Sequence, residues 1–183
     1  MNWIGPSLAA AVMAGAAPAL AAPDSAKAFA AFVQVCGDTH ADYPAVAAAA
    51  DAGGWKTTQV KADAFPGVTV ADSLSRDTSA GGAALTLQAW RGAKGAIQLS
   101  ECEVQVGKGR FADLQAAAQT WAGFAPQDAT AKKTTFLFTD EAGGHKAVAE
   151  AGRDAAAAGA GLQMLTVGAD QDGAIVSILK IKK

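Results

Sequence analysis

The sequence is poor in the residues that enzymes most often use as nucleophiles, bases and metal ligands. Its 183 residues include two histidines and two cysteines, and charged residues make up 17% of the chain. It has no Gly-x-Ser-x-Gly element, and the glycines that flank Lys108 lack the spacing and the Lys-Ser/Thr ending of a P-loop. From the sequence we predict no catalytic residue and no cofactor.

An excess of charge of one sign is also missing. The chain has 15 Lys and Arg residues against 17 Asp and Glu residues, which gives a formal net charge of -2. Because acids and bases are interspersed, there is no basic stripe of the kind that binds nucleic acid. The same balance argues against an anionic membrane surface as a partner. We expect no nucleic-acid partner and no stable membrane anchor.

The N-terminal segment is apolar but alanine-rich. Residues 1–22 contain no charged side chain and are interrupted by Gly5, Pro6, Gly15 and Pro18. A membrane span needs about 20 strongly apolar residues, so a cleaved signal peptide fits better, with Ala19 and Ala21 as the small residues of the cleavage site. We predict a signal peptide over residues 1–21, one domain over residues 22–183, and a periplasmic or secreted protein.

The two cysteines, Cys36 and Cys102, stand behind this segment. An even cysteine count after an export signal indicates a disulfide in an oxidising compartment. We predict that the two residues pair, with alpha carbons about 5.5 Å apart. Neither sulfur then offers a thiolate for catalysis or metal binding. Closing a loop of roughly 65 residues would stabilise the fold by about 4 kcal/mol in the chain-entropy model.

Apolar spacing and capping residues predict four helices. The first begins at Asp24 or Ser25 and places Cys36 on its buried face, and the second begins at Asp42 and ends before Gly53. The third and fourth cover residues 111–123 and 146–158. The second helix has proline in its first turn, where the missing amide hydrogen costs nothing.

Alternating apolar residues predict two hairpins and a further strand. The hairpins join residues 85–90 to 96–106 and residues 162–167 to 175–181, and the single strand covers 134–139. A change of apolar parity predicts a bulge near Ser100. Residues 56–82, rich in Pro, Gly, Ser, Thr and Asp, predict a long loop with one short strand. The expected class is α+β, a largely antiparallel sheet of five or six strands with about four helices mainly on one face.

Part of the chain resembles a known group of proteins. The run Phe32-Val33-Gln34-Val35-Cys36, then Thr39, then an alanine-rich segment ending in Ala52-Gly53-Gly54-Trp55, is similar to the opening of small secreted proteobacterial proteins of unknown function. Trp90, with a cysteine about a dozen residues later, is also similar. The resemblance implies export and a single disulfide, and it transfers no catalytic residue.

Two short segments carry metal-ligand side chains. Asp38, His40 and Asp42 alternate after Cys36, and a second cluster contains Asp140, Glu141 and His145. Two imidazoles and a carboxylate would suit zinc. Neither cluster has a recognised metal spacing, and helix caps and solvated loops account for such residues, so we predict no metal site and keep His40, Asp42 and His145 as weak candidates.

A candidate binding surface comes from aromatic residues. Trp90 falls on the polar parity of its strand beside Arg91, and with Trp55 it could form a contact surface for a partner. Packing of Trp90 in the core is the alternative. Glu101 and Glu103 share a strand face and could form a carboxylate pair, although a solvated face explains them as well.

Two function classes remain open. The first is an exported, non-catalytic domain that binds a protein, a peptide or an envelope component. The second is a small periplasmic hydrolase or metal-dependent enzyme that uses His40 and His145. The second becomes credible only if the fold brings the two rings within about 5 Å with a carboxylate between them.

Overall fold

The computed structural model describes residues 24–58, 65–142 and 144–183. The predicted signal peptide lies outside these residues. The described helices are α1 (Ser25–Phe32), the π-helix η1 (Val33–Gly37), α2 (Tyr43–Ala52), α3 (Phe111–Ala122), the 3-10 helix η2 (Glu150–Gly152) and α4 (Arg153–Ala158). The strands are β1 (Lys56–Thr57), β2 (Thr69–Ala80), β3 (Ala83–Lys94), β4 (Ile97–Gly107), β5 (Asp128–Ala129), β6 (Lys133–Glu141), β7 (Gly144–Ala147), β8 (Leu162–Asp170) and β9 (Gly173–Lys182).

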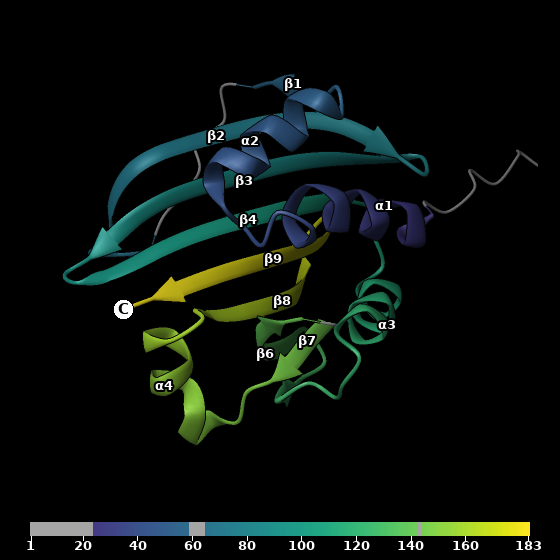
Figure 1. Ribbon diagram of the computed structural model, residues 1–183. Coiled ribbons are helices and arrows are strands. Elements are labelled where there is room, and N and C mark those ends of the chain that lie inside the picture. Colours follow the sequence, from purple (N-terminus) through teal and green to yellow (C-terminus); the bar gives the residue numbers. More distant parts are fainter. Residues whose placement is uncertain (1–23, 59–64, 143) are drawn as a thin grey trace, which may run out of the picture.

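All described strands belong to one antiparallel sheet (Figure 1). Its order is β1-β2-β3-β4-β9-β8-β6-β5, and β7 pairs with β6 beside this path. The α+β class and the antiparallel sheet are therefore confirmed, but the nine strands exceed the predicted five or six. The additional strands are the short β1, β5 and β7, which carry too few residues for an alternating pattern.

The prediction of a long loop over residues 56–82 is wrong for much of that range, because β2 forms a 12-residue strand there. Among its large apolar side chains only Leu74 is buried, so the sequence shows almost no alternation, yet β2 pairs with β3 from end to end. The predicted bulge near Ser100 is also wrong. Strand β4 pairs with both neighbours without a break, and the irregularity lies in β2, between Val70 and Asp72.

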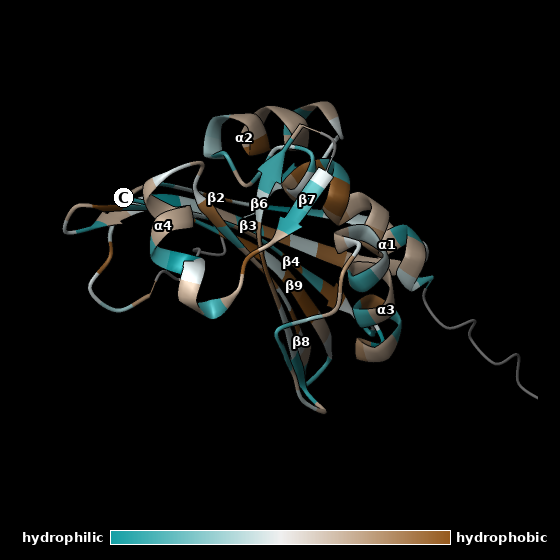
Figure 2. Ribbon diagram, turned by 60° about the horizontal axis from the view of Figure 1, so that its bottom comes forward, coloured by the Kyte–Doolittle hydropathy of each residue, from teal (hydrophilic) through white to brown (hydrophobic). Residues whose placement is uncertain are grey.

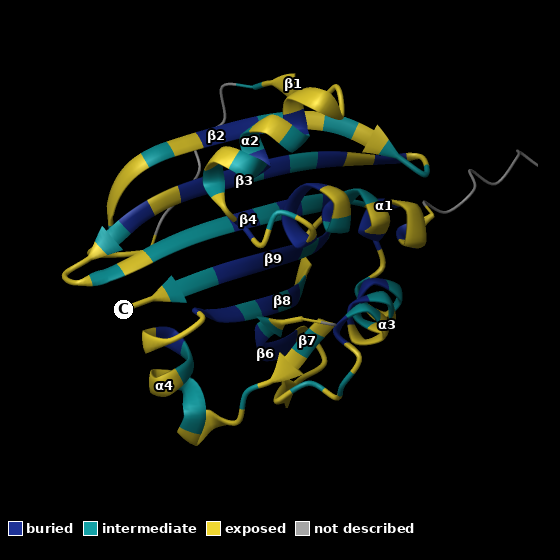
Figure 3. Ribbon diagram, in the orientation of Figure 1, coloured by how far each residue is buried: buried dark blue, intermediate teal, exposed yellow. Residues whose placement is uncertain are grey.

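The sheet has two distinct faces. One, the helix face, carries α1, α2 and α3 over buried strand residues that include Leu87, Val104 and Ile178. The other, the Trp90 face, presents the alternate residues of the same strands, and α4 packs there against Leu137 and Leu162. Figure 2 shows hydrophobic residues along the sheet and on the helices that lie over it, and Figure 3 shows buried residues along the central strands.

The starts of α1 and α2 and the end of α3 lie where the capping residues predict, whereas Cys36, expected on the first helix, lies in η1. Asp24 accepts hydrogen bonds from the first turn of α1, Asp42 accepts one from α2, and Gly123 ends α3 in the left-handed conformation. The fourth prediction is wrong in its first half, because the residues expected to begin that helix form β7 instead. Strand β7 pairs with β6, and only residues 153–158 are α-helical.

The predicted disulfide is confirmed. Cys36 and Cys102 are bonded, their alpha carbons are 5.5 Å apart, and both residues are fully buried. The bond joins η1 to the helix face of β4. Among the described residues, no helix combines the length and the hydrophobicity needed to cross a membrane.

Candidate functional site

The segment that follows Cys36 in the chain has an unusual backbone. The amide of Asp38 donates to the carbonyl of Val33 at 2.8 Å, and the amide of Ala41 donates to Cys36 at 3.0 Å, both five residues back. The hydroxyl of Thr39 donates to the carbonyl of Val35 at 2.8 Å. These bonds end the π-helix in a tight turn, a feature that is rare and often found at functional sites.

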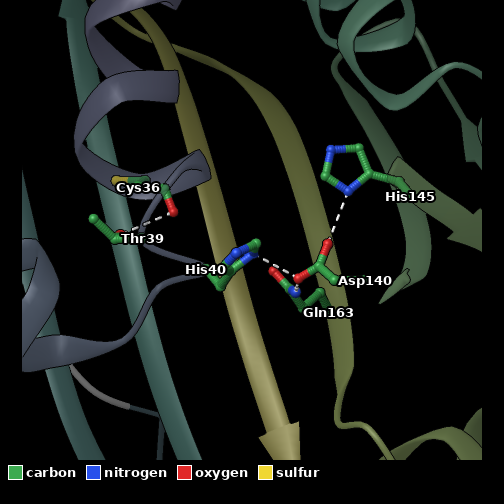
Figure 4. Close-up of polar contacts among 6 residues, drawn as sticks. All are labelled: Cys36, Thr39, His40, Asp140, His145 and Gln163. Carbon is green, nitrogen blue, oxygen red and sulfur yellow. Dashed lines mark hydrogen bonds and ion pairs between the residues drawn. The ribbon is translucent and has the colours of Figure 1, made fainter. Parts of the chain in front are cut away.

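Two consecutive residues of this turn are left-handed. His40 and Ala41 both have a φ of 52°, a conformation that costs a non-glycine residue about 1 kcal/mol or more. Their neighbours hold them there, because the amide of His40 donates to Gly37 and that of Asp42 to Thr39. The turn therefore presents the imidazole of His40 away from the helix, over the sheet (Figure 4).

The fold brings both histidines of the chain to one carboxylate. The Nδ1 atom of His40 lies 2.6 Å from Oδ2 of Asp140, and that of His145 lies 2.9 Å from Oδ1 (Figure 4). The Nε2 atom of Gln163 donates to the same carboxylate. Because an ionised carboxylate only accepts hydrogen bonds, both Nδ1 atoms carry the proton, which leaves Nε2 of each ring free of Asp140.

The two histidines differ in their surroundings. The ring of His145 is packed between Trp121 and Phe138, with centroids 4.1 and 4.7 Å away, and its side chain is 16% exposed. The side chain of His40 is 51% exposed. Gly37 permits this packing, since a β-carbon there would lie 3.1 Å from the ring of Trp121. His145 is therefore fixed in place, and His40 is the histidine that solvent can reach.

The remaining metal-ligand candidates do not join this cluster. The carboxylate of Asp42 accepts a hydrogen bond from the amide of Ala45 and caps α2, as the capping interpretation predicts. Glu141 pairs with Lys146 at 2.9 Å, and Asp38 is exposed. Within residues 24–58, 65–142 and 144–183, no group of three or more His, Cys, Asp or Glu side chains is arranged to hold a metal ion.

Beside the histidine cluster, the helix face opens into a groove of about 600 Å³. Its floor is formed by two neighbouring cross-strand rows. In the first, Arg91 of β3 is opposite Ser100 of β4, which is opposite Lys180 of β9. The second row contains Ala93, Gln98 and Lys182 in the same order. The next residue along the first row is Gln163 of β8, which donates to Asp140, so the groove and the cluster are adjacent.

The groove has an excess of positive charge. Arg91, Lys180 and Lys182 line it, and Asp42 is its only acidic lining residue among those described. Arg91 already pairs with Asp72 and lies 5.7 Å from the centre of the Tyr43 ring. No ion pair involves Lys180 or Lys182 within the part of the chain that the structure describes. The two lysines therefore supply positive charge that is not neutralised by an ion pair with any described residue.

Tyr43 forms part of the groove wall at the start of α2. Burial raises the pKa of its phenol, and Asp72 adds to the increase. The ring therefore remains neutral at physiological pH and offers an apolar surface together with a hydroxyl group. Ala71, Ala93 and Ala160 extend this apolar lining.

Two of the three predicted surface residues are buried. Trp90 is 2% exposed and Trp55 is 9% exposed, so neither presents an open aromatic face, and the packing alternative holds for Trp90. Its indole Nε1 donates to Oε2 of Glu101 at 2.9 Å, and its ring meets Phe65 edge to face. Arg91, in contrast, is exposed and belongs to the groove.

The two glutamates beside Trp90 are not on a fully solvated face. Burial, with a smaller contribution from Glu103, raises the pKa of Glu101 from 4.5 to about 7, although the hydrogen bond from Trp90 lowers it. Burial also raises the pKa of Glu103. Both carboxyl groups therefore hold protons at a higher pH than free glutamate does.

Sequence reasoning missed Gln163, Lys180 and Lys182. Gln163 gives no signal, because a single glutamine in a strand matches many roles. For the lysines a signal exists: alternate residues 174, 176 and 178 of β9 are apolar and buried, and the same parity then turns to lysine at 180 and 182. Comparison with protein-family models, curated proteins and solved structures yields no match for this chain.

Proposed function

We propose that this protein is an exported, non-catalytic domain that binds a peptide or an envelope component. The observation that carries the proposal is the groove at the end of the helix face, whose volume of about 600 Å³ lies within the range of ordinary ligand pockets. Its floor consists of strand residues and one wall of the start of α2. Rigid elements of this kind keep a binding site formed before the ligand arrives.

Export is part of the same proposal. The Cys36–Cys102 disulfide supports it, because such bonds persist mainly in oxidising compartments. The alanine-rich N-terminal residues and the resemblance to small secreted proteins support it as well. A protease-protection assay on intact and permeabilised cells tests it, and processing after Ala21 would appear as an N-terminus at residue 22.

Obstruction of the groove tests the binding function. Ala160 lines the groove and is exposed, so Ala160→Trp narrows the site without touching the core. Ala151 is exposed outside the groove, and Ala151→Trp is the matched control. Each protein is incubated with an envelope extract, and the retained molecules are identified by mass spectrometry. We expect a compound that the wild type and the control retain and that Ala160→Trp loses. Equal retention by all three proteins contradicts the proposal.

The histidine cluster favours a second candidate function, hydrolysis. A carboxylate lies between the two histidines, which is one of the two conditions of the enzyme alternative. Asp140 would act as a positioning residue that keeps the proton on Nδ1 of His40. The Nε2 atom of the half-exposed His40 side chain would then take a proton from a water molecule that attacks an ester or phosphoester bond, and would return it to the departing oxygen.

Hydrolysis of p-nitrophenyl acetate and bis(p-nitrophenyl) phosphate, followed by nitrophenolate absorbance, tests this candidate. If His40 is the base, His40→Gln lowers kcat about 100-fold or more. Asp140→Asn lowers it as well and moves the pH profile, because the amide can stabilise the other tautomer. His145→Gln serves as the comparison, because its ring is packed away from solvent. Equal rates for wild type and His40→Gln would leave only the binding function.

A further inference from the structure

We infer that the groove is a site for an amphipathic anion, a carboxylate or phosphate group attached to an apolar chain or ring. The inference rests on the proposed binding function and specifies its ligand chemistry. It starts from a change of character along the helix face. The cross-strand row of Ala89, Cys102 and Ile178 is fully buried, whereas the next row on the same face holds Arg91, Ser100 and Lys180.

This change coincides with the end of the helical cover. The apolar rows lie beneath α1, α2 and α3, but beyond the start of α2 the sheet is open, and the groove occupies that space. If this end of the sheet only had to be soluble, side chains of both charges would be expected on it. Lys180 and Lys182 instead project from one face of one strand, without an ion-pair partner among the described residues.

The neighbouring groups also favour an anion. The N-terminal end of α2 lies at the groove wall, with Asp42 and Tyr43 among the lining residues. Asp42 is not free to compete with a ligand, because its carboxylate caps α2. Asp72 is held by Arg91. Both of these carboxylates therefore have partners of their own.

The apolar lining of the groove indicates that the part of the ligand that carries the anionic group is apolar. The ring of Tyr43 and the methyl groups of Ala71, Ala93 and Ala160 form surfaces without charge. An inorganic anion would leave these surfaces exposed to water, whereas a short alkyl chain or a ring would cover them. The site therefore suits an amphipathic anion better than free phosphate or a neutral molecule.

Titration calorimetry at pH 7 with three defined probes tests the inference. Octanoate and octanamide have the same chain length and differ in charge, and inorganic phosphate has the charge without the chain. We expect octanoate to bind at least tenfold more tightly than either of the others, and its affinity to fall as sodium chloride rises from 50 to 500 mM. NMR shifts of groove residues such as Ser100 locate the binding.

A pair of double variants separates local charge from net charge. Lys180→Gln with Lys182→Gln should reduce the preference for octanoate over octanamide to less than threefold. Lys132→Gln with Lys133→Gln removes the same charge from two exposed residues where β6 begins, outside the groove, and should keep the preference. Melting temperatures of both variants confirm that they fold.

The outcomes distinguish the inference from the function that it rests on. If octanamide shifts the groove residues and binds as tightly as octanoate, the groove is a binding site but not one for anions. If octanoate binds equally to both double variants, or if phosphate binds as tightly as octanoate, the inference is overturned. If a compound from the envelope extract depends on an open groove while no probe binds, the binding function stands and the amphipathic anion is rejected.

Discussion

The helix face and the Trp90 face of the same sheet are stabilised in different ways. The helix face buries apolar side chains under three helices and is linked to them by a disulfide. The Trp90 face buries a tryptophan against a carboxyl group whose pKa is raised to about 7, and α4 covers a small apolar cluster beside it. The second face should therefore become less stable as the pH rises from 4.5 to about 7.

Removal of the disulfide, on the helix face, should cause the largest loss of stability. The double variant Cys36→Ala with Cys102→Ala frees a segment of 66 residues in the unfolded chain, which corresponds to about 4 kcal/mol in the chain-entropy model. Urea denaturation measures the loss in the free energy of unfolding. The wild type in dithiothreitol should lose a similar amount, and the oxidised protein should show no free thiol. A loss below about 1 kcal/mol would mean that the helices hold their places without the bond.

Truncation of Trp90 should have the next largest effect, on the opposite face. Trp90→Ala removes a ring that is 2% exposed and should cost about 3 kcal/mol. Trp90→Phe keeps most of the ring but leaves Glu101 without its indole donor, which should cost about 1 kcal/mol. Thermal denaturation compares the two variants with the wild type. If Trp90→Ala leaves the melting temperature within a few degrees of the wild type, the side chain acts at a surface and not in the core.

The contribution of Glu101 to the pH dependence of stability should be smaller than either of these losses. Between pH 4.5 and about 7 the folded protein retains a proton that the unfolded chain releases, so stability falls as the pH rises through this range. The full difference corresponds to about 3 kcal/mol, and partial exposure to solvent should reduce it to about 1 to 2 kcal/mol.

The variant Glu101→Gln isolates this contribution. It keeps an oxygen that can accept the indole hydrogen bond and removes the titrating proton. Urea denaturation should show the variant more stable than the wild type at pH 8 and equally stable at pH 4. An advantage that is the same at both pH values would assign the effect to packing and not to the charge.

Metal removal should have the smallest effect, a melting temperature unchanged by EDTA. Asp140 accepts hydrogen bonds from His40, His145 and Gln163, so the polar cluster at the edge of the helix face is held by hydrogen bonds. Differential scanning fluorimetry with and without EDTA measures this. If EDTA lowers the melting temperature by several degrees and zinc restores it, the cluster is a metal centre and the enzyme alternative is strengthened.

The features that could be predicted from the sequence are those with local signals. Caps and helical spacing are local signals, so the starts of α1 and α2 follow directly from Asp24 and Asp42. The disulfide follows because two cysteines allow one pairing. Strand β2 escaped prediction because main-chain pairing with β3 stabilises a segment that is polar on both faces. Its position in the sheet is a property of the whole fold.

The functional site depends even more on long-range pairing. His40, Asp140 and His145 were candidates by residue type, but only the meeting of the turn after η1 with β6 and β7 makes them neighbours. The burial of Trp90 depends on what lies over its face, including Phe65. The lysines of the groove could have been found from the alternation in β9, once the helix face of that strand was known.

The strand order also has a consequence for the order of assembly. The helices α1 and α2, strands β1 to β4 and both cysteines are complete in the chain before residue 108, whereas β9, the neighbour of β4, ends at Lys182. Because both cysteines lie in this first part of the chain, the disulfide can close while the outer edge of β4 is still unpaired. An open edge of this length is a template for pairing with another chain. Truncation before Gly173 would therefore leave a cross-linked N-terminal half that is prone to aggregation.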